Sequence, residues 1–330
     1  MSTKGINGKK ILLSGVKPTG RPHIGNYFGA MKQFVDLLNT GKYDCYFMIA
    51  DYHGLNSIQN AGAMRENIIE LAIDYLAIGL DPKKCVLFKQ SDVSAHTELA
   101  WIFDTITTMP YLMRAHAFKD ASAKDREISV GTFNYPMLMA ADILLYDTDI
   151  VPVGQDQKQH VEYTRDTAQK FNRIFGETFK MPEPFILEDV KVVPGTDGRK
   201  MSKSYGNDIN LFATDGEIQR AVMSIVTDSG GVGAGRVGIP TNVYAIHELI
   251  RDKQYLDKLY TENAGKYKIL KDALARDLQN FIRPLRERRE KIAKDREKVI
   301  KILQNGGKQA KKKADKTLTK AKENIGVTLK

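Results

Sequence analysis

The first two thirds of the chain alternate short apolar runs with helical patterns, and this alternation restricts the fold more than any other feature. Residues 10–15, 43–50 and 85–88 are predicted to be buried strands. Residues 25–38 and 63–78, between them, carry apolar side chains at helical spacing. Strand–helix–strand units of this size predict a parallel sheet with right-handed crossovers. The expected fold class is therefore α/β, with a doubly wound, Rossmann-like sheet that binds its ligand at the carboxyl ends of the strands.

A helical stretch interrupts this pattern after the third strand. Residues 97–146 are predicted to be mostly helical, with breaks near Met109-Pro110 and near Asn134-Tyr135-Pro136. A further strand at 149–154 and a helix at 157–172 then resume the alternation. We interpret residues 97–146 as an insertion into the sheet domain.

The last third of the chain shows helical patterns and no convincing strand. A Gly-rich segment at 194–207, expected to be flexible, precedes it. Residues 254–303 are predicted to be helical, with Gly306-Gly307 ending the last helix before a short Lys-rich one. We therefore expect a catalytic domain at 1–206 and an all-helical domain at 207–330.

Charge and cysteine content narrow the class of protein. The net charge of +10 and the pI near 9.3 fit a polyanionic partner such as RNA, although charge alone establishes none. No apolar run approaches the roughly 18 residues of a membrane-spanning helix, and the run at 11–16 is too short for a signal peptide. Cys45 and Cys85 lack metal-site spacing and are expected to be buried, reduced thiols. A soluble cytoplasmic protein is expected.

One group of polar residues follows the first strand, in the sequence Pro18-Thr19-Gly20-Arg21-Pro22-His23-Ile24-Gly25-Asn26. Backbone N–H groups at a helix start favour anionic phosphate, and Gly20 and Gly25 allow a nucleotide to approach the backbone closely. His23 and Asn26 are three residues apart and can both donate to phosphate oxygens. The alternative is a Gly/Pro turn that caps a helix, with incidental His and Asn.

A second group is Lys200-Met201-Ser202-Lys203-Ser204, which follows a loop rich in Gly and Asp at 194–199. Two lysines three apart on such a loop can neutralise the charge of a leaving pyrophosphate. The alternative is a solvated basic loop.

Together the two groups resemble the HIGH and KMSKS motifs of class I aminoacyl-tRNA synthetases. KMSKS is complete, and the first motif ends in Asn26 instead of His, a replacement familiar in the tryptophanyl branch. Residues 25–30, 135–146 and 151–160 resemble that branch in the continuation of the first motif, the amino-acid-binding helix and a strand with its loop. The chain departs from the branch at Lys17, where Gln is frequent, and at Gln155, where Glu is frequent.

The resemblance implies a pocket for tryptophan around Asp142. An indole offers one N–H donor and no acceptor, so a selective pocket needs one buried acceptor among apolar walls. Asp142 would be that acceptor, and the other implied substrate contacts are Met139, Val151 and Val153 as walls, Tyr135 and Gln157 at the α-amino group, and His53 beside the substrate. Asp142 as a surface carboxylate, Tyr135 as a core residue and His53 as a turn residue remain open.

The implied reaction joins tryptophan to tRNA(Trp) in two steps, through a tryptophanyl-adenylate. The expected catalytic residues are His23, Asn26, Lys200 and Lys203, which would stabilise the phosphates of ATP. The nucleotide would further contact Lys17, Pro18, Thr19, Gly25, Gly154, Gln155, Asp156, Val193, Met201, Ser202 and Ser204. Magnesium is expected to arrive with ATP, and no protein metal site is predicted.

The partners implied are L-tryptophan, ATP, tRNA(Trp) and a second copy of the chain, with no DNA and no membrane. The candidate tRNA surface is basic, and it comprises Arg283, Arg286, Arg288, Arg289, Lys291, Lys294, Arg296, Lys298, Lys308 and Lys311-Lys312-Lys313. Its alternative is a solvated helix, because acidic residues are interleaved with the basic ones.

Three other functions remain open. A tyrosyl-tRNA synthetase also places an Asp in its pocket, but the Gly25-Asn26-Tyr27 stretch and the Met139–Asp142 helix favour tryptophan. A ligase that forms adenylates without tRNA is disfavoured by the basic helical end of the chain. A catalytically inactive, RNA-binding paralogue is disfavoured by the intact motifs.

Overall fold

The computed structural model describes residues 8–115, 118–119, 127–154, 158–186, 192–227 and 239–329. These residues contain a five-stranded parallel sheet with the strand order β3-β2-β1-β4-β5. The strands are β1 (Lys10–Val16), β2 (Tyr43–Ile49), β3 (Cys85–Lys89), β4 (Ile150–Val153) and β5 (Glu183–Ile186). The strand order reverses between β1 and β4, so the predicted doubly wound α/β class is confirmed.

The edge strand β5 was not predicted. It has only four residues, and these include Glu183 at its start and Pro184. A short strand with a proline is typical of a sheet edge but carries no clear apolar pattern. Its pairing with β4 is therefore a long-range feature that the local sequence does not reveal.

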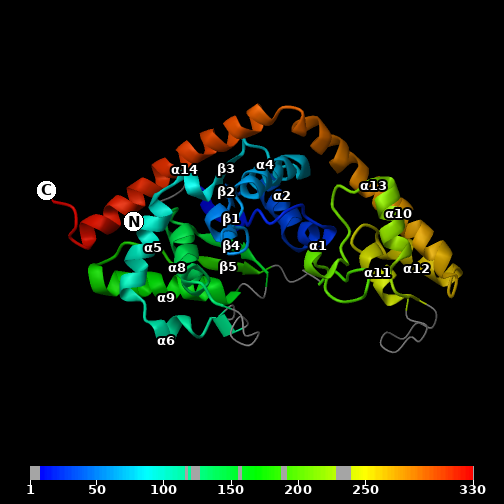
Figure 1. Ribbon diagram of the computed structural model, residues 1–330, viewed down its shortest axis with the longest axis horizontal. Coiled ribbons are helices and arrows are strands. Elements are labelled where there is room, and N and C mark those ends of the chain that lie inside the picture. Colours follow the sequence, from blue (N-terminus) through cyan, green and yellow to red (C-terminus); the bar gives the residue numbers. More distant parts are fainter. Residues whose placement is uncertain are drawn as a thin grey trace.

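Helices cover both faces of the sheet, as Figure 1 shows. On the N-terminal half they are α1 (Ile24–Asn26), the π-helix Tyr27–Met31, α2 (Lys32–Asn39), α3 (Asp51–Gly54), α4 (Ala61–Ile78), α5 (Ala95–Ile106), α6 (Met109–Leu112), α8 (Val130–Leu144) and α9 (Lys158–Phe175). Beyond them lie α10 (Asp215–Met223), α11 (Thr241–His247), α12 (Lys253–Glu262), α13 (Tyr267–Ala293) and α14 (Arg296–Asn324). The described residues after 207 thus contain helices and no named strand, as predicted.

Two hydrophobic cores form, one on each face of the sheet. Alternate strand residues face opposite ways, so Leu12 enters one core and Leu13 the other. The first core joins α2 and α4 to the helices of the C-terminal half, and the second joins α5, α8 and α9 to the end of α14. The sheet is therefore the common support of both halves of the molecule.

The insertion between β3 and β4 contains α5, α6 and α8. The predicted break near Asn134-Tyr135-Pro136 is wrong, because Pro136 lies inside α8. Proline removes one backbone hydrogen bond from a helix. Here its ring is buried and α8 packs against both α5 and α9, so tertiary packing offsets the local cost.

The predicted helix end at Gly306-Gly307 is also wrong, since both residues lie inside α14. A Cβ on Gly306 would come within 1.9 Å of the Leu87 carbonyl oxygen, and one on Gly307 within 2.9 Å of Asp92 Cβ. The glycines are therefore present for a close approach of α14 to β3 and the turn after it. They let this long helix cross from the C-terminal half to the sheet (Figure 1).

Buried ion pairs connect α13 to α4. Arg289 is 8% exposed; its Nε donates to Asp74 Oδ1 at 2.6 Å and its Nη2 donates to Glu70. Arg296, at the start of α14, donates to Glu70 at 2.7 Å as well. The positive charges of Arg289 and Arg296 are therefore paired with carboxylates of the protein itself.

Candidate active site

The loop after β1 leads into α1 through a reciprocal cap formed by His23 and Asn26. His23 Nδ1 accepts from the Asn26 backbone N–H at 3.2 Å, and Asn26 Oδ1 accepts from the His23 N–H at 3.1 Å. His23 and Asn26 are therefore themselves the cap of this helix, and the cap has a chemical consequence. Because Nδ1 accepts, the neutral ring carries its proton on Nε2 and keeps that N–H as a donor.

The surroundings of His23 hold its ring in the neutral form. Burial is the main cause that lowers the pKa of His23 to about 4; Asp208 opposes it, and Lys203 and Lys200 add to the lowering. At neutral pH the ring is therefore an uncharged donor beside two lysines. Such an arrangement suits phosphate oxygens, which only accept hydrogen bonds.

The two motifs, far apart in the chain, are joined in space. Lys203 Nζ donates to the Thr19 carbonyl oxygen at 2.8 Å. The backbones pair through Ile24 N to Ile209 O at 2.9 Å and Leu211 N to Pro22 O at 3.0 Å. The segment after the second motif thus pairs with the first motif at its His23 end, after β1.

Asn207 organises the loop that carries the second motif, and the sequence analysis did not identify it. Its Nδ2 donates to Asp197 Oδ1 at 2.6 Å and to the Lys200 carbonyl at 3.2 Å, and its Oδ1 accepts from Ser202 N at 2.8 Å. A Cβ on Gly195 would lie 2.3 Å from Asn207 Nδ2, so only glycine fits there. The available signal was an asparagine that follows the Tyr205-Gly206 turn directly after the motif.

The two lysines of the second motif lie at the solvent side of this loop. Lys200 and Lys203 are both exposed, while Met201 between them is buried and donates its backbone N–H to the Val193 carbonyl at 2.9 Å. Partial burial lowers the pKa of Lys203, against the opposing effects of Asp208 and Asp74. Both side chains are therefore accessible from solvent.

Asp142 is buried in the second core, so the alternative of a surface carboxylate is wrong. It is 2% exposed. Its Oδ2 lies 2.9 Å from His53 Nε2, and its Oδ1 accepts from Gln90 Nε2 at 2.7 Å and lies 2.6 Å from His96 Nδ1. Burial alone would raise the pKa of Asp142, but His96 and His53 outweigh it and lower the pKa to about 2. The residue is therefore a carboxylate at neutral pH.

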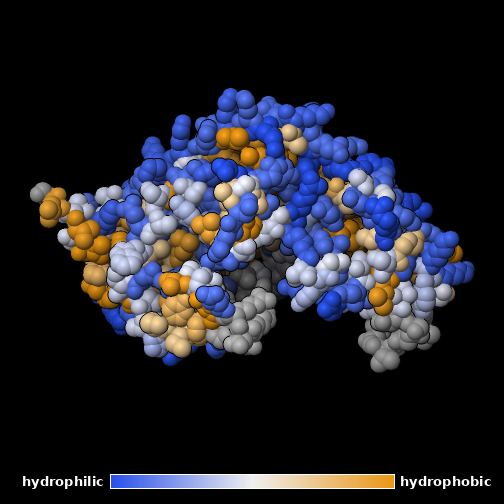
Figure 2. All heavy atoms as spheres, viewed as in Figure 1, coloured by the Kyte–Doolittle hydropathy of each residue, from blue (hydrophilic) through white to orange (hydrophobic). Residues whose placement is uncertain are grey.

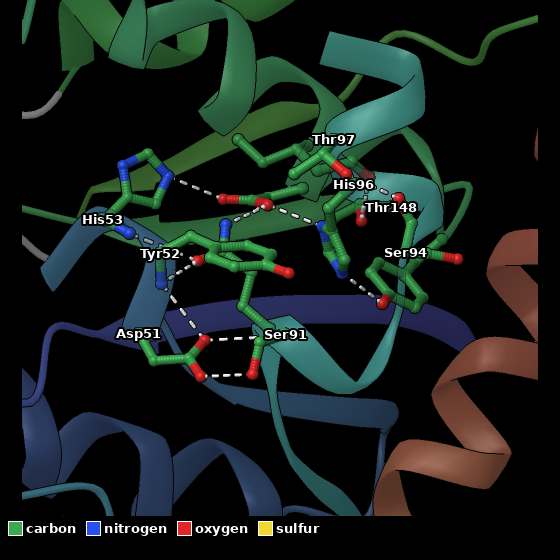
Figure 3. A network of polar contacts seen from close by, with 12 residues as sticks. Asp51, Tyr52, His53, Ser91, Ser94, His96, Thr97 and Thr148 are labelled. Atoms are coloured by element: carbon green, nitrogen blue, oxygen red, sulfur yellow. Dashed lines mark hydrogen bonds and ion pairs between the residues drawn. The ribbon is translucent and has the colours of Figure 1, made fainter. Parts of the chain in front are cut away.

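The partners of Asp142 come from the ends of two neighbouring strands. His53 lies on α3, directly after β2, and Gln90 lies in the 3-10 turn Gln90–Asp92 directly after β3. His96 is in the first turn of α5. Figure 3 shows His53 and His96 pointing toward one carboxylate from opposite sides. Gln90 and His96 were not predicted to be site residues, although their position just after a strand is a usable signal.

Other predicted substrate contacts lie near this carboxylate. The Tyr135 ring packs edge-on against the His53 ring at 6.3 Å between centroids, and the Tyr135 hydroxyl pairs with His160 Nε2. The predicted walls Met139, Val151 and Val153 all belong to the core that contains Asp142's neighbours on α8. The structure thus brings Asp142, His53 and Tyr135 together, while their roles in binding remain predictions.

The predicted nucleotide contacts are only partly described. Pro18 is buried against α3, where a Cβ on Gly54 would meet Pro18 Cδ at 3.3 Å, and Lys17 is exposed. Thr19 and Gly25 lie beside Lys203 and Met201, and Gly154 directly follows β4. Gln155, Asp156 and Gln157 lie outside the described residues.

The described part of the chain brings no three His, Cys, Asp or Glu side chains together as metal ligands. Cys45 and Cys85 lie opposite each other on β2 and β3, and both are buried free thiols. Burial raises the pKa of each to about 12, so neither is a reactive thiolate.

The fold and the joined motifs define a class of protein, and comparison with known proteins identifies it. The family model described as "tRNA synthetases class I (W and Y)" matches residues 6–283, which places the chain in that class of enzymes. The tryptophan–tRNA ligase of Fusobacterium nucleatum is 48% identical over 320 residues, covering 96% of this chain and 97% of that protein. The ligase of Rhodopirellula baltica is 41% identical, covering 96% and 99%. This chain therefore belongs to the tryptophan–tRNA ligase family.

A solved structure supports the same assignment. The tryptophanyl-tRNA synthetase of Campylobacter jejuni, complexed with ADP and tryptophan, superposes with a TM-score of 0.87 at 40% identity. The alignment covers 96% of this chain and 99% of that one. The predicted family, fold and class of enzyme are confirmed.

Proposed function

We propose that this chain activates L-tryptophan with ATP and transfers it to tRNA(Trp). The observation that carries the proposal is the convergence of the two motifs with a buried carboxylate at one edge of the sheet. His23, Asn26, Lys200 and Lys203 supply donors and positive charge for phosphates at the end of β1. Asp142 supplies the single acceptor that an indole N–H requires.

The reaction needs no protein nucleophile. The tryptophan carboxylate attacks the α-phosphate of ATP, pyrophosphate leaves, and a terminal ribose hydroxyl of the tRNA then attacks the carbonyl of the adenylate. The protein contributes positioning and electrostatic stabilisation of the charge that develops on the phosphates. Neutral His23 donates from Nε2, and Lys200 and Lys203 neutralise the leaving pyrophosphate. Bound Mg²⁺ would add charge at the phosphates, held mainly by their oxygens.

Specificity for tryptophan over tyrosine tests the proposal most directly. Amino-acid-dependent exchange of pyrophosphate into ATP should occur with tryptophan and not with tyrosine, and Asp142→Ala should lose most of it. Asp36→Ala, which removes an exposed carboxylate on α2, is the matched control and should retain full exchange. Exchange with tyrosine would move the activity to the sister branch, and no exchange with any amino acid would favour an inactive paralogue.

The tRNA surface that the structure supports is smaller than the sequence predicted. Arg289 is buried, Arg283 and Arg286 pair with Asp215, and Arg296 pairs with Glu66 and Glu70. Of the basic residues predicted for this surface, the exposed lysines for which no ion pair is described are Lys291, Lys294, Lys298, Lys308 and Lys312. Figure 2 shows hydrophilic residues along this ridge. We propose that these lysines contact the tRNA. The proposal includes the predicted division of the chain into a catalytic domain at 1–206 and a helical, tRNA-binding domain at 207–330.

A second copy of the chain is proposed to cover the apolar patch on α5, α6 and the start of α8. Trp101, Met109 and Val130 are 70%, 67% and 75% exposed, and Met113 beside them is 47% exposed. Figure 2 shows apolar residues gathered over this region. Patches of this kind mark protein–protein contacts. Trp101→Lys should turn a dimer into a monomer in sedimentation equilibrium; a monomeric wild type would refute the assignment.

No helix among the described residues is long and apolar enough to cross a membrane. For the location of the protein we propose the cytoplasm.

A further inference from the structure

The two oxygens of Asp142 are held very differently. Oδ1 accepts from Gln90 Nε2 at 2.7 Å and lies 2.6 Å from His96 Nδ1, whereas Oδ2 meets only His53 Nε2, at 2.9 Å, among the described residues. A carboxylate oxygen has about two acceptor directions. Oδ1 is therefore enclosed by two side chains of the core, and Oδ2 keeps one direction for a further donor.

Gln90 is fixed so that its amide can donate only toward Asp142. The side chain is 0% exposed. Its Oε1 accepts from the backbone N–H groups of Tyr52 at 3.1 Å and His53 at 3.4 Å. A flipped amide would place NH₂ against two N–H donors and oxygen against a carboxylate, so that orientation is excluded. Gln90 thus links the loop that carries His53 to the Asp142 carboxylate.

His96 is fixed by a second chain of contacts. It is 0% exposed, its ring stacks on Phe88 at 6.4 Å, and its Nε2 lies 2.8 Å from the Tyr146 hydroxyl. Burial, with the nearby Asp142 charge, raises the pKa of Tyr146 far above its usual value, so the hydroxyl keeps its proton. The Asp142 carboxylate that Nδ1 faces can only accept hydrogen bonds. Nδ1 then carries the proton that faces Asp142 Oδ1. The N–H direction departs from that of a linear hydrogen bond, so the N–H dipole interacts with the charge of the carboxylate without forming a hydrogen bond.

We propose that Gln90 and His96 are positioning residues that determine selectivity for a substrate with a ring N–H. They occupy Oδ1 and thereby turn Oδ2 of Asp142 toward the substrate. The proposal rests on the proposed role of Asp142 as the indole acceptor. Neither residue need touch the substrate, so their loss should weaken recognition of the N–H without impairing the chemistry at phosphate.

The test compares L-tryptophan with β-(3-benzothienyl)-L-alanine, in which sulfur replaces the ring N–H. For each substrate, kcat/KM is measured in pyrophosphate exchange on wild type, Gln90→Met, His96→Leu and His96→Asn. Gln90→Met should reduce kcat/KM for tryptophan by about 10- to 100-fold, the range for a lost hydrogen bond to a charged group. His96→Leu should reduce it in the same direction but by a smaller factor, because the His96 contact is not a hydrogen bond. The value for the sulfur analogue and the KM for ATP should change less than about threefold, within which packing effects fall.

Asparagine places an amide where Nδ1 stands, so His96→Asn should restore much of the selectivity that His96→Leu loses. Gln219→Met is the matched control, because Gln219 also donates to a carboxylate, that of Asp272, at 3.2 Å, but outside the site. Its selectivity should equal that of wild type. Should Gln90→Met fail to fold, the two His96 variants still decide the matter.

Equal losses for both amino acids, or no loss for tryptophan, would overturn the positioning role. A wild-type enzyme that uses both amino acids equally well would instead overturn the role of Asp142 itself. The failure of this inference can thus be told apart from the failure of the proposed function.

Discussion

Two buried aspartates, one in each half of the molecule, each contact a histidine of their own but differ in how their negative charge is balanced. Asp142 and Asp277 are 2% and 3% exposed, and each has a pKa lowered to about 2. Each accepts from a histidine Nε2 at 2.9 Å, His53 in one case and His247 in the other. Asp277 in addition binds Arg251 through both oxygens, at 2.9 and 2.8 Å.

Because Arg251 binds both oxygens of Asp277, the Asp277 cluster has a structural role and leaves little room for a further ligand. Arg251 neutralises the carboxylate permanently, and His247 uses both ring nitrogens, because Nδ1 lies 3.1 Å from the Tyr260 hydroxyl. No Arg or Lys among the described residues contacts Asp142. Gln90 and two imidazoles stabilise its negative charge at the carboxyl edge of the sheet, and Oδ2 can still accept one further hydrogen bond. A balanced carboxylate ties helices together, whereas one held by polar donors can still bind a substrate.

The largest effect is expected for Asp142→Asn. Gln90 and His96 would hold the new carbonyl oxygen at the Oδ1 position, which turns the NH₂ toward the substrate. A donor would then face the indole N–H, and kcat/KM for tryptophan should fall roughly 100-fold or more. Steady-state pyrophosphate exchange measures this. An asparagine variant with near-normal kinetics would show that Oδ2 does not receive the indole.

The matched change at Asp277 should affect stability and leave catalysis intact. Asp277→Asn removes the negative partner of Arg251 and is expected to lower the free energy of unfolding by about 2 kcal/mol. The cost stays below that of a fully buried pair because the Arg251 side chain is 42% exposed. Urea unfolding gives the stability, and exchange kinetics below the transition should equal those of wild type. A loss of tryptophan specificity here would break the distinction between the two clusters.

The sequence predicted four of the five strands and both motifs because these are local patterns. It did not predict the partners of Asp142, since the Gln90 contact depends on α8 lying over the turn that follows β3. Gly306 was read as a helix end, because glycine usually disfavours helix and its contact with Leu87 is a tertiary feature. Arg289 was counted as an RNA contact because its charge is visible in the sequence and its burial against Asp74 is not. Local chemistry was thus predictable, and the pairing of charges across elements was not.

A smaller effect is expected in the pH dependence of stability. Burial, opposed by Asp277, lowers the pKa of His247 below its usual value of 6.5. The unfolded chain therefore takes up a proton as pH falls through 6.5 that the folded chain does not, and stability falls with it. The two aspartates lose their contribution only as pH falls below about 4 toward their folded pKa of about 2.

His247→Gln keeps a donor for Asp277 and removes the titrating group. The loss of stability between pH 7 and pH 5, measured by urea midpoints, should be smaller in the variant than in wild type. It should not vanish, because the pKa of His23 is lowered to about 4 and contributes in the same direction. Identical losses in both proteins would mean that His247 is charged in the folded state, and Arg251 would then not be the sole cation balancing Asp277.

The smallest effect is expected where a carboxylate is exposed. Asp36 pairs with Lys32 one turn earlier on α2, and the two side chains are 57% and 47% exposed. Water screens such a pair, so Asp36→Asn should change the free energy of unfolding by less than about 0.5 kcal/mol. Urea unfolding beside Asp277→Asn measures the difference. If Asp36→Asn and Asp277→Asn lowered the free energy of unfolding equally, burial would not explain why a carboxylate stabilises the fold. The functional difference between Asp277 and Asp142 would then need a cause other than how their buried charges are balanced.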